Sequence, residues 1–340
     1  MKRLIRVGLS IVLSLVLIAI CFRGTDPKAV WAALRQARPG YLAVAVALSL
    51  LTFAVRALRW RVLLGHLRRG VPFVSLFNCT VIGFMVSYVL PGRVGELARP
   101  VLLAVKERMS KGSVIATVAL ARMMDFLTVL LFFSVYLIGF SSRLPASGSE
   151  WMHQFRSWGI VVGAAILAAV IGLYAIVLLR THLFDRLEAW TRPGGWARGV
   201  VDFFHAVVRG FEVLKGGRAL AGSMILTLVT WCIIDLSILA GLRAFGIRLD
   251  FADVFLLIAF LAGGIAVPTP GGLGAYQAAG LFCLVTFFGI GQDLALAAIW
   301  AQWGLAVIPV LALGAVLIWK EGLTLGQVGK MVRKEESVAR

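Results

Sequence analysis

The sequence is poor in charged residues, and acidic residues are the scarcer kind. Charged residues make up 15% of the 340 residues and hydrophobic residues 60%, whereas a soluble domain has about 25% charged and about 45–50% apolar residues. One soluble core cannot hold so much apolar surface, and disorder requires low hydrophobicity. The composition therefore predicts an all-α, polytopic membrane protein. The 34 Lys and Arg against 16 Asp and Glu give a net charge of +18, which we assign to the membrane surface and not to nucleic acid.

Motifs for metal binding, cofactor binding and catalysis are also missing. The four cysteines form no CxxC pair, and the four histidines have no metal-ligand spacing to one another or to a cysteine. The chain contains no Walker A loop, no HExxH and no GxSxG. We therefore expect no metal and no cofactor, and a membrane-embedded transferase is the least favoured class.

Long apolar runs are what the chain has instead. A transmembrane helix needs about 20 mainly apolar residues, and six stretches satisfy this, at 4–22, 41–64, 113–140, 158–179, 219–245 and 293–319. Two further apolar stretches, 73–105 and 253–289, are interrupted by Pro and Gly, which break a straight helix. Opened backbone at membrane depth must be buried in protein or line a polar cavity. We therefore predict that both stretches are re-entrant helical hairpins.

The distribution of basic residues predicts the orientation. With both termini inside, the inside segments are 1–6, 56–72, 106–111, 180–218 and 320–340, and they hold 23 Lys and Arg. The outside segments hold only 7, so the positive-inside rule favours an N-in, C-in protein. Residues 321–340 are expected to form a basic cytoplasmic tail that frays over anionic headgroups.

The order of these elements predicts an inverted repeat within a single membrane domain that spans 1–340. Helix, helix, re-entrant hairpin and helix occur in that order in the halves at about 1–145 and 157–320, and the halves start on opposite sides of the membrane. Both breaks carry P-G-x-x-G at an offset of 179 residues, and the same offset relates Arg56 to Asp235. Many transporters are built in this way.

The two breaks are candidate anion-binding sites. Each starts a new half-helix, whose free N–H groups and positive dipole end would point toward the membrane midplane. The alternative is that both breaks are only structural kinks. The candidate residues at the breaks are Pro91, Gly92, Arg93 and Gly95 in the first, and Pro270, Gly271, Gly272, Gly274, Tyr276 and Gln277 in the second.

Ionisable residues inside apolar segments are costly and mark functional sites. We include Arg56, Arg59, Glu96, Arg99, Arg122, Asp125 and Asp235 in the candidate substrate site. Several alternatives stay open. Arg56 and Arg59 could snorkel to the cytoplasmic interface, Glu96–Arg99 and Arg122–Asp125 could be self-neutralising i, i+3 pairs, and Asp235 could pair with an Arg across the repeat.

Three motifs resemble the lysylphosphatidylglycerol synthase transmembrane (flippase-like) family over about residues 5–320. They are SYVLPGRVGELARP at 87–100, RMMD at 122–125 and PTPGGLGA at 268–275. The resemblance implies movement of aminoacylated phosphatidylglycerol or a related lipid between leaflets, with roles for Arg93, Glu96, Arg99, Arg122 and Asp125. The chain departs from the family pattern at Ala121 and at Tyr276–Gln277, where relatives often place an acid. The missing acids make a plain anionic or glycosylated lipid as good a candidate as a lysyl one.

These observations favour a lipid flippase or scramblase in the plasma membrane of a bacterial or archaeal cell. Two alternatives remain, a membrane subunit that presents a lipid to a synthase or glycosyltransferase, and an ion-coupled transporter of small solutes. Membrane lipids are the expected partners, and a lipid-modifying enzyme and a second copy of the chain are the protein partners considered.

Overall fold

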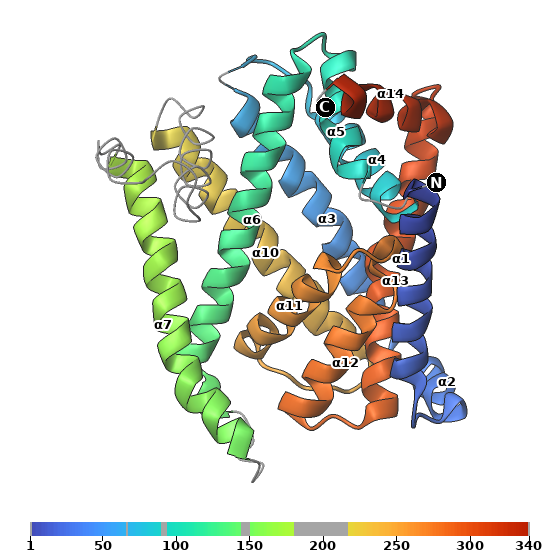
Figure 1. The fold of residues 1–340 in the computed structure, drawn as a ribbon, viewed down its shortest axis with the longest axis vertical. Helices are drawn as coiled ribbons and strands as arrows, with labels where there is room; N and C mark the ends of the chain where they lie inside the picture. The colour runs from blue at the N-terminus through green and yellow to red at the C-terminus, as the bar shows by residue number, and fades with distance from the viewer. Residues whose placement is uncertain (1, 66, 90–93, 144–149, 180–216, 339–340) are drawn as a thin grey trace.

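The computed structural model describes residues 2–65, 67–89, 94–143, 150–179 and 217–338, and every regular element in these ranges is helical (Figure 1). The elements are α1 Lys2–Phe22, α2 Pro27–Gln36, α3 Pro39–Leu64, α4 Phe73–Val89, α5 Val94–Lys106, α6 Lys111–Gly139, η1 Ser141–Arg143, α7 Glu150–Leu179, α10 Gly217–Ala244, α11 Phe251–Ala266, η2 Pro270–Gly272, α12 Ala275–Phe288, α13 Gln292–Lys320 and α14 Leu325–Val338. The prediction of an all-helical protein is confirmed.

Each of the six predicted spans contains a helix, and five segments of the described chain are long and apolar enough to cross a membrane. These segments are Pro39–Leu64, Lys111–Gly139, Arg218–Ala244, Pro270–Phe288 and Gln292–Lys320. A sixth is counted if Gly8–Phe22 and Pro27–Gln36, which meet at 86°, form one bent span. The set differs from the predicted one at α12, whose segment Pro270–Phe288 qualifies by length and composition. The predicted span 158–179 lies within α7, a helix of 30 residues.

Both interrupted stretches are pairs of short helices that pack against each other, α4 with α5 and α11 with α12. Small residues let the paired backbones approach closely. A Cβ on Gly83 would lie 2.6 Å from the Arg99 Cβ, and one on Gly264 would lie 2.6 Å from the Ala275 carbonyl oxygen. The arms of each pair are therefore separate helices, with α4 ending at Val89 and α5 beginning at Val94, and glycines let the two arms pack closely.

The helix pairs lie toward opposite ends of the molecule. In Figure 1, α4 and α5 lie near the end that holds α14 and both chain termini, whereas α12 lies toward the end that holds α2. Between them, α3 and α10 pack along each other, α4 packs against α13, and α11 packs against α6. The long helices thus form a frame around the two pairs.

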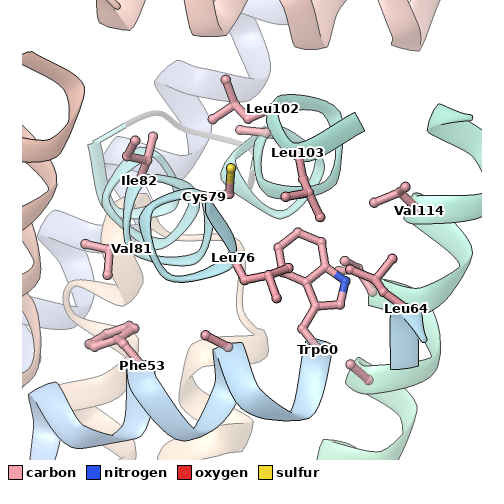
Figure 2. Packing of buried hydrophobic residues seen from close by; sticks show 14 of the residues in the cluster. Phe53, Trp60, Leu64, Leu76, Cys79, Val81, Ile82, Leu102, Leu103 and Val114 are labelled. Carbon is pink, nitrogen blue, oxygen red and sulfur yellow. The ribbon is translucent and has the colours of Figure 1, made fainter. Parts of the chain in front are cut away.

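The buried hydrophobic residues form one large cluster around each helix pair. The first joins α3, α4, α5 and α6 (Figure 2), and its centre is Trp60, which is fully buried and packs among Leu76, Leu103 and Val114. The Trp60 indole N–H donates to Thr117 Oγ1 at 3.0 Å. The second cluster joins α6, α10, α11, α12 and α13. Each pair is therefore held in its own core.

The C-terminal segment differs from the prediction. Residues 325–338 form α14, which packs against α5 with Val328 fully buried. The expectation of a frayed tail was wrong because the segment has an apolar side that the charge count did not reveal. Val328 and Met331 pack at the first core cluster.

Candidate functional site

The centre of the site is Asp125, a buried carboxylate near the middle of α6. Arg59 donates to both its oxygens, from Nη1 at 2.6 Å and from Nη2 at 3.2 Å, and Arg56 donates from Nη1 at 3.1 Å. Both arginines lie one turn apart on α3 and are 7% and 1% exposed. The snorkelling alternative for Arg56 and Arg59 is therefore wrong, and counting them among the loop residues of 56–72 overstated the cytoplasmic charge by two.

Two residues of α10, which the sequence did not predict as site residues, bond to Asp125 and to Arg59. The Trp231 indole N–H donates to Asp125 Oδ1 at 3.2 Å, and Arg59 Nη1 donates to Thr227 Oγ1 at 3.1 Å. The sequence contains a pattern that could have identified them, because Thr227 and Trp231 are four residues apart in an apolar helix and so share a face. With four hydrogen bonds, Asp125 is a fixed counter-ion and a poor candidate for a general base.

A second layer of charge lies beside Asp125 and its partners. Arg122 Nη2 is 3.7 Å from Glu96 Oε1, and both side chains are more than a third exposed. The guanidiniums of Arg122 and Arg56 lie over the Phe84 ring at 5.3 and 5.4 Å. The self-neutralising pairing of Arg122 with Asp125 is therefore wrong, since each side chain pairs with a residue on another helix. We call Arg56, Arg59, Glu96, Arg99, Arg122 and Asp125 the arginine cluster.

Arg99 is the member of the arginine cluster whose charge is least compensated. It is 4% exposed, and its guanidinium stacks over the Trp60 ring at 4.1 Å. Its Nε and Nη2 are buried and have no hydrogen-bond partner in the described part of the chain. Arg56, Arg59, Arg122 and Asp125 all lie within electrostatic range of it. Four guanidiniums against two carboxylates leave this cluster with a net charge of +2.

The tip of the second helix pair is a glycine-rich turn in which several backbone N–H groups already donate within the protein, whereas the buried Thr269 Oγ1 and Gln277 Nε2 have no partner among the described residues. Gly271, Gly272 and Gly274 have positive φ values of 59°, 74° and 82°, which favour glycine. The N–H of Gly274 donates to Gln277 Oε1 at 2.7 Å, and Trp303 Nε1 donates to the Gly271 carbonyl at 3.0 Å. The N–H groups of Gly272 and Leu273 also donate within the turn. These N–H groups are therefore not free for an anion. Pro270 lies in η2, and Tyr276 and Gln277 are buried in the first turn of α12.

Part of the first tip lies outside the described residues, namely Pro91, Gly92 and Arg93. The contacts of the residues that flank this tip are described. A Cβ on Gly271 would lie 3.3 Å from the carbonyl oxygen of Tyr88, near the end of α4. Gly95 is buried, and a Cβ there would overlap the backbone of Gly83 and Ser87. The two helix pairs therefore meet near their tips, and Gly95 serves the packing of α4 on α5.

Asp235 lies apart from the arginine cluster. Its side chain is 0% exposed, and neither carboxylate oxygen has a hydrogen bond or an ion pair among the described residues. The predicted partnership with an Arg across the repeat is therefore wrong. The described residues also contain no group of three or more His, Cys, Asp or Glu that could hold a metal ion.

A helical frame of membrane-spanning length that encloses buried charge defines the class of this protein as a multi-pass helical membrane protein. Residues 5–314 match the family described as Lysylphosphatidylglycerol synthase TM region, and the chain belongs to that family. The predicted resemblance is confirmed.

Two relatives extend this comparison. The UPF0104 membrane protein of Methanothermobacter thermautotrophicus is 24% identical over 310 residues, which cover 85% of this chain and 87% of that protein. Glycosyltransferase AglD of Haloferax volcanii is 25% identical over 301 residues, which cover 82% of this chain and 48% of AglD. The chain thus matches about half the length of AglD.

Proposed function

We propose that this protein moves a lipid with an anionic headgroup between the two leaflets of the plasma membrane. The observation that carries the proposal is Arg99, a buried guanidinium in a cluster of net positive charge, two of whose nitrogens have no hydrogen-bond partner among the described residues. Burying such a charge without a partner is costly. A lipid phosphate supplies the missing partner, since a guanidinium binds phosphate oxygens through two parallel hydrogen bonds.

The lengths of the paired helices support re-entrant hairpins in this proposal. α4, α5 and α11 have 17, 13 and 16 residues, so at 1.5 Å per residue they reach about 20–26 Å, short of the roughly 30 Å hydrocarbon core. Among the paired helices that the structure describes, α12 reaches membrane-spanning length only together with η2. The frame helices α3, α6, α10 and α13 have 26, 29, 28 and 29 residues and are long enough. The close approach of Gly271 to Tyr88 supports tips that meet inside the membrane.

The packing pattern supports the inverted repeat. If α3, α4, α5 and α6 correspond to α10, α11, α12 and α13, then the packing of α4 on α13 corresponds to the packing of α11 on α6. The packing of α5 on α6 likewise corresponds to that of α12 on α13, and α3 packs on its own counterpart α10. Two halves related in this way can rock about α3 and α10 and expose a central site to each side in turn.

The class of lipid headgroup is inferred from the charged side chains that remain available to bind it. The carboxylates of Asp125 and Glu96 both face arginines, so neither is available to bind a lysyl amine. The second tip offers Tyr276 and Gln277 and no acid. The proposal therefore favours a plain anionic or glycosylated lipid, which reaches the arginine cluster from the partly exposed side of Arg122 and Glu96.

Reconstitution in liposomes tests the proposal. The purified chain is inserted into vesicles that carry headgroup-labelled phosphatidylglycerol, and the accessibility of the label from outside is followed over time. We expect faster exchange than in protein-free vesicles. Exchange no faster than in protein-free vesicles, for phosphatidylglycerol and for a glycosylated phospholipid alike, contradicts the proposal.

A second candidate function is a membrane partner that presents a lipid to a glycosyltransferase. The similarity to AglD, whose name is that of a glycosyltransferase and of which the chain matches about half, favours it. Affinity purification of the tagged chain from its own cell, in mild detergent, distinguishes the two. Recovery of a glycosyltransferase in a fixed ratio to the chain, together with no lipid exchange by the chain alone, would favour the partner role.

A further inference from the structure

Asp235 is a buried carboxylate that the proposed transport site does not use. It lies in α10, its side chain is 0% exposed, and both its oxygens lack a partner among the described residues. Removing an isolated carboxylate from water costs so much that such a group takes up a proton instead of staying ionised. Such surroundings favour the neutral, protonated form of the Asp235 carboxyl group.

The position of Asp235 connects it to the arginine cluster. Thr227, Trp231 and Asp235 follow one another at intervals of four residues, so they lie one above another on α10. Thr227 accepts a hydrogen bond from Arg59, and Trp231 donates one to Asp125. The face of α10 that holds the arginine cluster thus continues by one turn to Asp235, and a movement of α10 against α3 and α6 acts on both.

The described neighbours of Asp235 provide no fixed counter-charge. α10 packs against α3, α6, α11 and α13, and the members of the arginine cluster on these helices are Arg56, Arg59, Arg122 and Asp125. These four are engaged within the arginine cluster. Asp253 of α11 and Asp293 of α13 accept hydrogen bonds from the backbone N–H groups of Asp250 and Asp26. The titratable neighbour on α10 itself is Cys232, one turn earlier.

We infer that Asp235 binds and releases the proton that couples lipid movement to a proton gradient, an inference that rests on the proposed lipid transport. When the halves rock and water reaches α10 from one side, the acid releases its proton to that water. When the other side opens, the carboxylate takes a proton from there, so one proton crosses per cycle and no other bond changes. A proton needs only the carboxylate itself, whereas a hard cation such as Na⁺ is held by several oxygen ligands.

Infrared spectroscopy of the full chain tests proton binding without any transport assay. A protonated carboxylic acid has a carbonyl stretch that ionised carboxylates lack. We expect this band at pH 7 in the wild type and in Asp250→Asn, a matched exposed acid at the start of α11, and expect it to be absent in Asp235→Asn. A spectrum of Asp235→Asn that keeps the full band would overturn the inference.

Proteoliposomes with an imposed pH gradient test the coupling. With one proton per lipid, a gradient of one pH unit shifts the equilibrium ratio of labelled phosphatidylglycerol between leaflets by about ten-fold, since each 1.4 kcal/mol is a factor of ten. We expect this shift in the wild type, Asp235→Glu and Asp250→Asn, and no shift in Asp235→Asn. A wild type that equilibrates lipid without responding to the gradient, or an equal response to a Na⁺ gradient, overturns the coupling. Absence of lipid exchange in every variant overturns the proposed function, and the infrared result then decides proton binding by itself.

Discussion

At the scale of single residues, Asp125 and Arg99 show how partners decide what a buried charge does. Asp125 has hydrogen bonds from Arg56, Arg59 and Trp231 and joins α3, α6 and α10. Arg99 contacts the Trp60 ring, and two of its nitrogens have no hydrogen-bond partner in the part of the chain that the structure describes. The hydrogen bonds of Asp125 stabilise the fold, whereas the guanidinium of Arg99 can still bind an anion. The two residues should therefore respond in opposite ways to substitution.

Replacing the partnered charge should destabilise the protein. In Asp125→Ala, Arg56 and Arg59 stay buried without their carboxylate, and breaking a buried pair from one side costs about 3–5 kcal/mol. We expect a clearly lower unfolding temperature for the detergent-solubilised protein. Asp250→Asn, which changes an exposed acid, is the control and should unfold like the wild type. Equal unfolding temperatures for Asp125→Ala and the control would show that the ion pairs do not hold the helices.

Replacing the unpartnered charge should not destabilise the protein. Arg99→Met keeps an apolar contact with Trp60 and removes a buried charge that has no acidic partner among the described residues, a change that is often neutral or stabilising. We therefore expect an unfolding temperature equal to or above that of the wild type. A drop as large as that of Asp125→Ala would mean that the guanidinium is structural, with an unrecognised partner in the protein.

The residue types of the site could be predicted from the sequence, but their pairing could not. Arginines and acids in apolar segments stand out because they are costly there, and this identified Arg56, Arg59, Arg99, Arg122 and Asp125. Local spacing then suggested i, i+3 pairs, yet Asp125 pairs across helices with α3 and Arg122 with Glu96 on α5. Spacing along one helix carries no information about which helix lies opposite, so tertiary packing decided the pairs.

At the scale of the elements, the contact of α4 with α5 depends on glycine at position 95. A Cβ on Gly95 would overlap the backbone of Gly83 and Ser87, which cannot give way as a flexible side chain does. Forcing extra atoms into a packed contact costs about 1–3 kcal/mol or more. We expect Gly95→Ala to lower the unfolding temperature and the yield of folded protein. Gly112→Ala in α6 has nothing within 4 Å of the added Cβ and should be tolerated; equal behaviour of both variants would contradict the close contact.

A second element contact, at the end of α13, predicts a dependence on pH. Burial acts to raise the pKa of Glu321, but hydrogen bonds from Lys106 and Asn78 outweigh it and hold that pKa below its usual value. Because the pKa of Glu321 is lower in the folded state, the ionised carboxylate stabilises the folded protein at pH values above the usual pKa of 4.5. This stabilisation is lost as the pH falls through the folded-state pKa. Glu321→Gln should therefore be slightly less stable than the wild type at pH 7, and the difference should vanish in acid. A difference in unfolding temperature that persists at the lowest pH would exclude this cause.

At the scale of the whole molecule, hydrophobic runs and Pro-Gly breaks were enough to predict the helices. They were not enough to predict two features. α14 packs on α5 with Val328 buried. The basic composition of this segment does not predict that one of its valines is buried. The α12 segment reaches membrane-spanning length only when η2 is included, and a turn of that kind depends on the Trp303 and Gln277 hydrogen bonds that tertiary structure supplies.

At the scale of the whole molecule, we propose that an anionic lipid crosses the membrane by way of Arg99. The most direct measurement is the rate of leaflet exchange of phosphatidylglycerol and of zwitterionic phosphatidylcholine in vesicles that contain the wild type, Arg99→Met, or the matched exposed control Arg61→Met. We predict that the wild type and the control prefer phosphatidylglycerol. Since a hydrogen bond to a charged group contributes about 1.5–3 kcal/mol, we also predict that Arg99→Met loses about ten-fold or more of the phosphatidylglycerol rate while remaining folded. An Arg99→Met protein that exchanges phosphatidylglycerol at the wild-type rate would contradict the account.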